Sequence, residues 1–70
     1  MQNKIKIHRA IHDLTQAQLA VKVGKSTGTI NALEANKYSP SLTFALRLAR
    51  LFKVPVEELF LFEDGVDDVE

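Results

Sequence analysis

The sequence predicts an all-α domain of five short helices, because apolar residues recur at three- and four-residue spacing along most of the chain. Residues typical of helix boundaries separate these stretches, namely Gly24, Pro40 and Pro55. Two short stretches, 4–7 and 59–62, alternate residue by residue instead. Each of these two stretches is therefore a candidate for a short β-strand.

The first helix is expected at about residues 3–12, with Asn3 as its candidate N-cap. Its apolar stripe is loose and consists of Ile5, Ile7, His8 and Ile11. Lysine and isoleucine alternate at 4–7, so a short N-terminal strand is the rival interpretation for the start of this helix.

Residues 14–37 carry the most specific pattern in the chain, which predicts two short helices joined by a tight turn. Thr15 and Gln18 form a capping box at the start of the first of these helices, which covers 15–23. The threonine hydroxyl accepts from an amide of the first turn, and the glutamine reaches back to the amide of the cap residue. Gly24 supplies the backbone freedom that a helix C-terminus often needs.

The second helix of the pair is expected at 26–35, with Ser26 as its cap. Small and apolar residues at helical spacing let the two helices cross closely, and these are Ala20, Ile30 and Leu33. A helix pair of this kind can present its second helix to the major groove of DNA.

The last two helices are expected after Pro40 and at Pro55, because proline blocks the continuation of a preceding helix. Ser41 starts the fourth helix. Its expected core face consists of Leu42, Ala45, Leu46, Ala49 and Phe52, widened by Leu48 and Leu51, with Arg47 and Arg50 outside. The short fifth helix has Glu57 and Glu58 in its first turn, where the helix dipole favours acids.

The charge of the chain is divided between its two parts. Residues 1–53 carry nine Lys and Arg against two acids, a net charge of +7, whereas residues 54–70 carry seven acids and no Lys or Arg. A basic body with an acidic end favours a nucleic-acid ligand, although such asymmetry also occurs without function. We expect one domain over 1–63 and a disordered acidic tail over 64–70, which serves either solubility or the repulsion of non-specific DNA.

Other classes of protein lack support in the sequence. The chain has no cysteine, no apolar run of membrane-spanning length and no apolar signal-peptide core, so we expect a cytoplasmic protein that does not bind a membrane. No phosphate-binding glycine loop or nucleophile pattern predicts catalysis. His8 and His12 have the spacing of two metal ligands but lack a clear third, so we expect no metal, no cofactor and no enzymatic activity.

Residues 14–37 resemble the helix-turn-helix of the Cro/C1 family of phage repressors. The likeness continues through 36–42, 45–49 and 54–60, which are similar to the later helices and loops of that domain, and it covers about 3–62. The resemblance implies a five-helix, lambda-repressor-like fold. It extends to the short stand-alone regulators of the family, such as the cytolysin repressor, which end in an extended Phe-rich stretch. In these regulators extended terminal segments pair beside the helices, near a dimer interface, so the resemblance also implies a short terminal pair of β-strands.

The resemblance also implies which residues contact DNA. They lie at the start of each helix of the pair and in the loop that follows the second helix: Gln16, Lys25, Ser26, Thr27, Gly28, Thr29, Asn31, Asn36, Lys37 and Tyr38. The family holds a phosphate from the position of Gln16, and lysines at Lys25 and Lys37 would neutralise backbone charge. Tyr38 can equally pack its ring against the fourth helix.

The second helix of the pair departs from the usual family pattern at 26–29, where many relatives carry long Arg or Gln side chains. This chain has Ser-Thr-Gly-Thr there, so Asn31 is the one side chain suited to a bidentate contact with adenine. Two explanations compete. The backbone approaches DNA closely at Gly28 and reads shape and thymine methyl groups, or specificity is weak and affinity comes from phosphate contacts.

Two further expectations also follow from the resemblance. Arg9 and Glu34 match an Arg and a Glu that form a partly buried ion pair in phage repressors. The candidate dimer interface consists of Ser39, Pro55, Val56, Phe60 and Phe62. The alternative for the two phenylalanines is that they complete the core of the monomer.

Two classes of function are compatible with these patterns. The first is a sequence-specific transcriptional regulator, a homodimeric repressor that binds a palindromic operator in double-stranded DNA. The second is a protein-interaction module, such as an antitoxin, that grips a protein partner through its Phe-rich segment and acidic tail. Selection of DNA sequences from a random pool separates the two.

Overall fold

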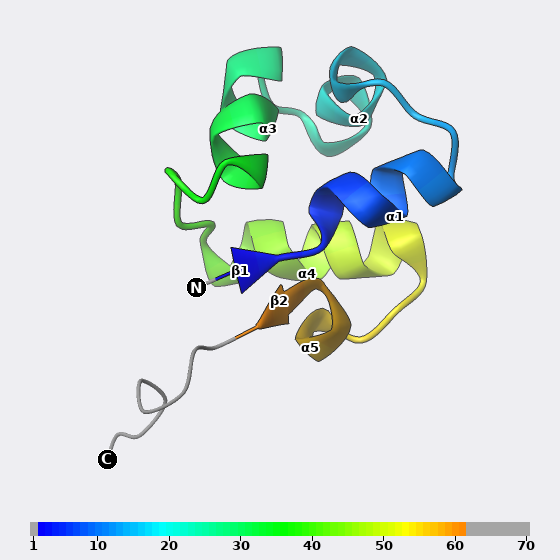
Figure 1. The fold of residues 1–70 in the computed structure, drawn as a ribbon, viewed down its shortest axis with the longest axis vertical. Helices are drawn as coiled ribbons and strands as arrows, with labels where there is room; N and C mark the ends of the chain where they lie inside the picture. The colour runs from blue at the N-terminus through cyan, green and yellow to red at the C-terminus, as the bar shows by residue number, and fades with distance from the viewer. Residues whose placement is uncertain (1, 62–70) are drawn as a thin grey trace.

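The computed structural model describes residues 2–61 of the chain. This part contains five helices and one short pair of strands. The elements are β1 (Gln2–Asn3), α1 (Ile5–Ile11), α2 (Gln16–Val23), α3 (Thr27–Glu34), α4 (Leu42–Phe52), α5 (Val56–Leu59) and β2 (Phe60–Leu61). Figure 1 shows α2 and α3 at one end of the molecule and α5 with the strands at the other, with α1 and α4 between them. The predicted five-helix architecture is confirmed.

The strand pair joins the two ends of the domain, as the alternative prediction proposed. Gln2 pairs with Leu61 and Asn3 with Phe60 in an antiparallel ladder. The predicted position of the first strand, residues 4–7, is wrong, because the helix already begins at Ile5. The predicted helix start at Asn3 is also two residues too early. Asn3 lies in the strand, although its side-chain Oδ1 accepts a hydrogen bond from the amide of Ile5 at 3.1 Å.

The buried core is drawn from every helix and from β2. Its members are Ile5, Leu19, Ala20, Val23, Ile30, Leu33, Phe44, Ala45, Leu48, Ala49, Phe52, Leu59 and Phe60. In α1 only Ile5 is buried, whereas Ile7 and Ile11 are 56% and 68% exposed. The loose stripe predicted for this helix is therefore mostly solvent-facing.

The buried face of α4 differs in part from the predicted one. Ala45, Leu48, Ala49 and Phe52 are buried as predicted, whereas Leu42 and Leu46 are 72% and 51% exposed and Phe44, which was not assigned to the core, is buried. Apolar residues cover more than half of this helix, so its periodicity alone does not fix which edge of the apolar stripe is buried. The bulky Phe44 ring enters the core, and this rotates Leu42 and Leu46 outward.

Three of the predictions concern residues outside the described part of the chain. Residues 62–70 and Met1 lie outside the described part of the chain. The predicted acidic tail at 64–70, the domain boundary at 63 and the dimer residue Phe62 fall among them and stay predictions.

Candidate nucleic-acid interface

Hydrogen bonds between residues close in the chain define the start and end of α2 in the helix-turn-helix. Thr15 Oγ1 accepts from the amide of Gln18 at 3.0 Å, and the amide of Thr15 donates to Gln18 Oε1 at 2.9 Å, so the predicted capping box is present. Gly24 ends α2 with φ +71°. In this left-handed conformation glycine has no steric penalty, and the amide of Lys25 can bond the carbonyl of Ala20 at 2.9 Å.

The same turn also receives a contact from α4. Arg47 Nη1 donates to the carbonyl of Val23 at 3.2 Å, so this exposed side chain satisfies a carbonyl at the end of α2. The sequence analysis placed Arg47 outside the core but assigned it no role. No local signal could have found this bond, because its two residues are 24 positions apart in the chain.

The inner side of α3 is fixed by packing. Ala20 of α2 is 2% exposed at the crossing with α3, and Ile30 and Leu33 are 0% and 1% exposed. These are the three residues that were predicted to let the two helices cross closely. Because they fix the rotation of α3 about its axis, they also determine which residues point outward.

The outer side of α3 presents Thr27, Gly28 and Asn31, which are all exposed. Ser26 and Thr29, also predicted to contact DNA, are partly engaged within the protein. Ser26 Oγ accepts from the amide of Thr29 at 3.1 Å, as the predicted cap does, and lies 3.0 Å from Thr29 Oγ1. Their hydroxyls therefore fix the start of α3 in addition to any contact with a ligand.

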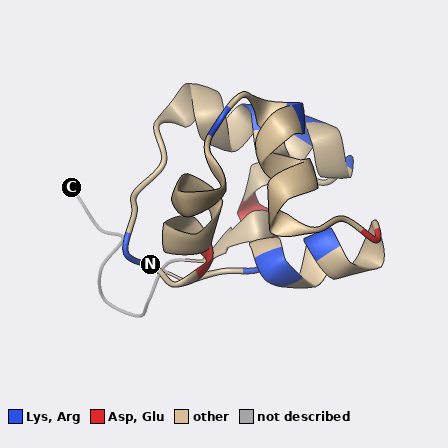
Figure 2. Cartoon of the chain, turned by 90° about the horizontal axis from the view of Figure 1, so that it is seen from above, with Lys and Arg blue, Asp and Glu red and all other residues tan. Residues whose placement is uncertain are grey.

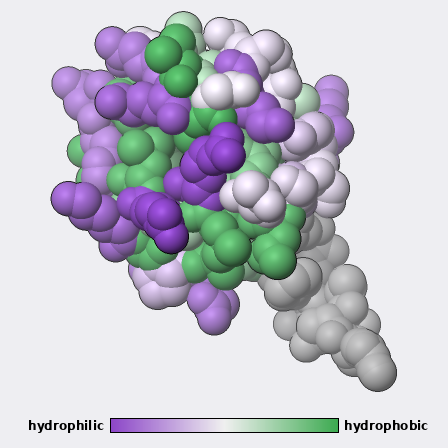
Figure 3. Space-filling model, turned by 180° about the vertical axis from the view of Figure 1, so that it is seen from behind, coloured by the Kyte–Doolittle hydropathy of each residue, from purple (hydrophilic) through white to green (hydrophobic). Residues whose placement is uncertain are grey.

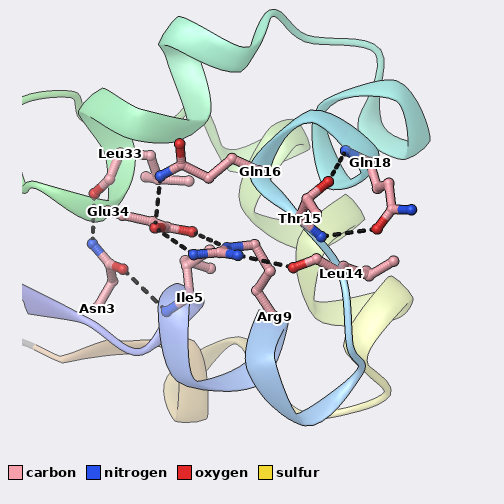
Figure 4. Close-up of polar contacts among 9 residues, drawn as sticks. All are labelled: Asn3, Ile5, Arg9, Leu14, Thr15, Gln16, Gln18, Leu33 and Glu34. Atoms are coloured by element: carbon pink, nitrogen blue, oxygen red, sulfur yellow. Dashed lines mark hydrogen bonds and ion pairs between the residues drawn. The ribbon is translucent and has the colours of Figure 1, made fainter.

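A polar network ties α3 to α1 and α2, as Figure 4 shows. Arg9 Nε lies 2.7 Å from Glu34 Oε2, and Arg9 Nη2 donates to Glu34 Oε1 at 3.3 Å. The two side chains are 17% and 6% exposed, so the partly buried ion pair expected from the resemblance is present. Arg9 Nη1 also donates to the carbonyl of Leu14 at 2.8 Å, which joins the loop between α1 and α2 to the network.

Gln16 is a member of this network, which the sequence analysis did not foresee. Its Nε2 donates to Glu34 Oε1 at 3.0 Å (Figure 4). An amide nitrogen carries two hydrogens, so one N–H is left for a second acceptor such as a phosphate. Gln16 is also the first residue of α2, where free backbone amides favour an anion.

The segments on either side of α3 meet on the ring of Phe44. Lys25 Nζ lies 5.1 Å from the centre of this ring, and the ring of Tyr38 meets it edge-on at 6.2 Å. Tyr38 therefore packs against α4, one of the two alternatives left open, and is still 37% exposed. Both contacts tie the segments that precede and follow α3 to α4.

The loop after α3 is held from the strand pair. Asn3 Nδ2 donates to the carbonyl of Leu33 at 2.8 Å and to Asn36 Oδ1 at 2.9 Å. Asn36 has φ +62°, a left-handed conformation that asparagine tolerates better than most residues. Lys37 is exposed next to it. The predicted phosphate-contacting residues Asn36 and Lys37 thus sit on an anchored loop.

The charge distribution leaves α3 without a free acid. The acids within residues 2–61 are Asp13, Glu34, Glu57 and Glu58, and Glu34 is paired with Arg9. Glu57 and Glu58 lie on α5, at the end of the molecule away from α3 (Figures 1 and 2). Figure 2 shows Lys and Arg outnumbering acids over the remaining helices. A polyanion would therefore meet little repulsion at α3.

An apolar groove of about 540 Å³ lies between the start of α4 and the α5–β2 segment. It is lined by Pro40, Ser41, Leu42, Ala45, Val56, Glu57, Phe60 and Leu61. Two of the predicted dimer residues, Val56 and Phe60, line it, although Phe60 is only 8% exposed and mainly completes the core. Figure 3 shows that polar side chains surround exposed apolar patches on the face opposite to that in Figure 1.

Two other predicted dimer residues, Ser39 and Pro55, do not line this groove. Ser39 lines a separate polar hollow of about 280 Å³ with Asn36, Lys37 and Tyr38, and Pro55 is exposed beside Val56 without lining the groove. Leu42 and Leu61, which are 72% and 39% exposed, also line the groove and were not among the predicted interface residues. Leu42 was instead predicted to face the core.

Neither a metal site nor a membrane span is found in the described part of the chain. No group of three or more His, Cys, Asp or Glu gathers there, and no helix among residues 2–61 is long and apolar enough to cross a membrane. His8 and His12 instead pack their rings against Phe52, at centroid distances of 5.7 and 5.2 Å.

Comparison with known proteins agrees with this geometry. A helix-turn-helix family model matches residues 5–59, which include all five helices. The chain belongs to the Cro/C1-type helix-turn-helix family. This is a family of DNA-binding transcriptional regulators and not of enzymes.

Relatives are found in archaea and bacteria. An uncharacterized HTH-type transcriptional regulator of Methanocaldococcus jannaschii is 50% identical over 64 residues, which cover 91% of this chain and 97% of the relative. The uncharacterized HTH-type transcriptional regulator YgzD of Bacillus subtilis is 36% identical over 91% of this chain and 97% of its own length. The crystal structure of a candidate DNA-binding protein from Bacteroides fragilis has a TM-score of 0.75 and 36% identity, over 83% of this chain and 94% of that one.

Proposed function

We propose that this Cro/C1-type regulator is a homodimeric repressor that places α3 of each subunit in the major groove of a palindromic operator. The observation that carries the proposal is the orientation of α3. Its apolar residues and Glu34 are held inward, while Thr27, Gly28 and Asn31 are exposed on the opposite side. A helix fixed in this way can enter the groove, which admits one α-helix.

Residues around α3 would hold the phosphate backbone on both sides of the groove. Gln16 offers an amide at the start of α2, and Lys25, Asn36, Lys37 and Tyr38 flank α3. Phosphate contacts of this kind fix the register of the protein on the duplex without reading sequence. The lysines would make affinity fall as salt rises, because each neutralised phosphate releases counterions.

A second copy of the chain is the proposed occupant of the apolar groove. The groove runs along α4, α5 and β2, away from α3, so a dimer formed there leaves both copies of α3 free. A two-fold dimer presents its recognition helices about one helical turn of DNA apart, roughly 34 Å, and therefore binds a palindrome. Occupancy of such a site within a promoter would block transcription.

Selection from a random duplex pool tests this proposal. Sedimentation of the protein alone and with the enriched duplex counts subunits, and a salt titration measures phosphate contacts. Enrichment of one palindrome by a dimer, with affinity that falls steeply as salt rises, supports the repressor. Binding without an enriched sequence contradicts the sequence-specific function, and a monomer on a single half-site contradicts the dimer.

A protein-interaction module is the second candidate, and the apolar groove is the observation that favours it. A groove lined by Leu42, Phe60 and Leu61 fits an apolar segment of another protein as well as a second copy. Absence of DNA binding at low salt, together with a monomer in sedimentation, would favour this function. DNA binding through α3 is compatible with a protein partner in the groove, but such a partner would displace the second copy of the chain proposed to lie there.

A further inference from the structure

Two of the four hydrogen-bonding side chains of α3 are already engaged within the protein. Thr29 shares its hydroxyl with Ser26, and Glu34 accepts from Arg9 and Gln16. The hydrogen-bonding side chains of α3 that are exposed are those of Thr27 and Asn31. Only Asn31 has both a donor and an acceptor in a fixed plane, as a bidentate contact with adenine N6 and N7 requires.

Gly28 lies three residues before Asn31 on the same exposed side of α3. The fold does not require glycine at this position. Its φ is not positive, and a Cβ built there meets only Ser26 Oγ at 3.8 Å, an ordinary contact. Glycine in a helix is less favourable than alanine, so the monomer would be at least as stable with a methyl group at position 28.

The short side chain of Asn31 connects its role to that of Gly28. Asparagine carries one methylene group before its amide, whereas glutamine carries two, so asparagine reaches a base edge only when the helix backbone lies close to the base. A Cβ at position 28 would stand on the surface next to Asn31 and hold the helix away from the DNA. The bare backbone at Gly28 removes that obstacle.

We propose that Gly28 and Asn31 act as one specificity device: the missing Cβ lets α3 sit deep enough for the short Asn31 amide to read an adenine. The proposal rests on the DNA-binding function proposed above and names the base that α3 reads. Thr27, one residue before Gly28, presents a methyl group suited to contact with a thymine methyl. Each half-site is therefore identified at A·T pairs rather than at a guanine read by arginine.

Four proteins test the device: the wild type, Gly28→Ala, Asn31→Ala and the double variant. The probe is the palindrome that the wild type enriches from a random pool, compared with the same duplex in which one A·T pair of each half-site is replaced by G·C. For the wild type, replacement of the read pair lowers affinity about 5- to 150-fold per contact. We expect either single substitution to remove this discrimination, and the double variant to bind no worse than Gly28→Ala alone.

Gly28→Ala is expected to fold normally and to melt at the same temperature or at one higher by up to about 8 °C. A loss of base preference in a protein of equal or greater stability cannot come from unfolding. In the Gly28→Ala background, Asn31→Gln should restore part of the adenine preference, because the longer side chain spans the added distance. Ala10→Gly removes a Cβ from an exposed position of α1 and should leave the base preference unchanged.

Retention of the full adenine preference by Gly28→Ala would overturn the coupled device. Independent, additive losses in the double variant would overturn it as well. If the wild type enriches no sequence at all, the sequence-specific function itself fails, and this outcome is distinct because it precedes any substitution.

Discussion

Helices α3 and α4 expose different kinds of side chain to their surroundings, although both bury an apolar stripe in the same core. The outer side of α3 carries Thr27, Gly28 and Asn31, whereas the outer side of α4 carries Leu42 and Leu46. The first surface is polar and flat, which suits the base edges and phosphates of DNA. The second surface is apolar at the start of α4, where Leu42 lines a groove that suits a protein surface. The proposed DNA contacts and the proposed dimer contacts thus lie at different ends of the molecule.

The difference extends to how each helix is held. A network of ionic and hydrogen-bonded groups adds to the apolar packing of Ile30 and Leu33 in holding α3, while α4 is held mainly by apolar packing of Phe44, Leu48 and Phe52. Substitutions in the network should therefore affect the DNA-binding end first. Substitutions in the groove should affect association without loss of the fold.

The largest expected effect comes from Glu34→Ala, which leaves Arg9 partly buried without its partner. We expect the free energy of unfolding to fall by about 2–4 kcal/mol, since breaking one member of a buried ion pair leaves an uncompensated charge. Chemical denaturation measures this change. Glu58→Ala, at an exposed position of α5, is the matched control and should stay within about 0.5 kcal/mol of the wild type. Equal effects of the two substitutions would show that the network does not hold α3.

Leu42→Asp tests the apolar end of the molecule. A charge in the groove should raise the dimer dissociation constant by at least about tenfold, since apolar anchors supply most of the energy of such interfaces. Because Leu42 is 72% exposed, the monomer should stay folded by circular dichroism. Leu46→Asp is the control: Leu46 is exposed on the same helix, but it lines a different hollow, beside Arg47 and Arg50. Sedimentation that gives the same dimer for both variants would exclude the groove as the interface.

Ser26→Ala tests how the start of α3 is fixed. The loss of the cap to the amide of Thr29 should lower the stability of the domain by about 1 kcal/mol, within the usual range for such caps. Thermal or urea denaturation checks this value. Ser39→Ala, at an exposed position that makes no hydrogen bond among residues 2–61, should be neutral. A neutral Ser26→Ala would mean that packing of Ile30 and Leu33 alone sets the start of the helix.

Lys37→Ala is expected to have the smallest effect, and only on DNA binding. The loss of one phosphate contact per subunit should reduce the slope of log affinity against log salt by roughly 2 per dimer, with little change in base preference. Lys6→Ala, in α1, removes the same charge from a surface away from the proposed contacts. Identical slopes for the two variants would remove the loop after α3 from the interface.

The sequence predicted the helix-turn-helix residue by residue because its signals are local. The capping box at Thr15, the glycine turn at Gly24 and the cap at Ser26 each depend on residues only a few positions apart. The ion pair between Arg9 and Glu34 came from the resemblance to the family. Neither source showed that Gln16 joins this pair, because that contact depends on how α2 and α3 cross.

The buried face of α4 could be predicted only in part. Its periodicity alone does not fix which edge of the apolar stripe is buried, and the choice depends on where the ring of Phe44 fits among Lys25, Tyr38 and the core. The start of α1 was misplaced for a related reason: Asn3 is drawn into a strand by Phe60, which is 57 residues away in the chain. Contacts between distant segments decided both cases.

The central claim is that α3 binds DNA while the groove binds a second copy of the chain. The most direct test compares binding to a duplex with two half-sites and to a duplex with one. The duplex enriched by the wild type, and the same duplex with one half-site scrambled, are titrated with the wild type and with Leu42→Asp. We predict that the wild type binds the intact palindrome far more tightly, whereas Leu42→Asp binds both duplexes with the same weak affinity. Equal binding of the wild type to one and two half-sites would contradict the account, because α3 would then read DNA without a second copy in the groove.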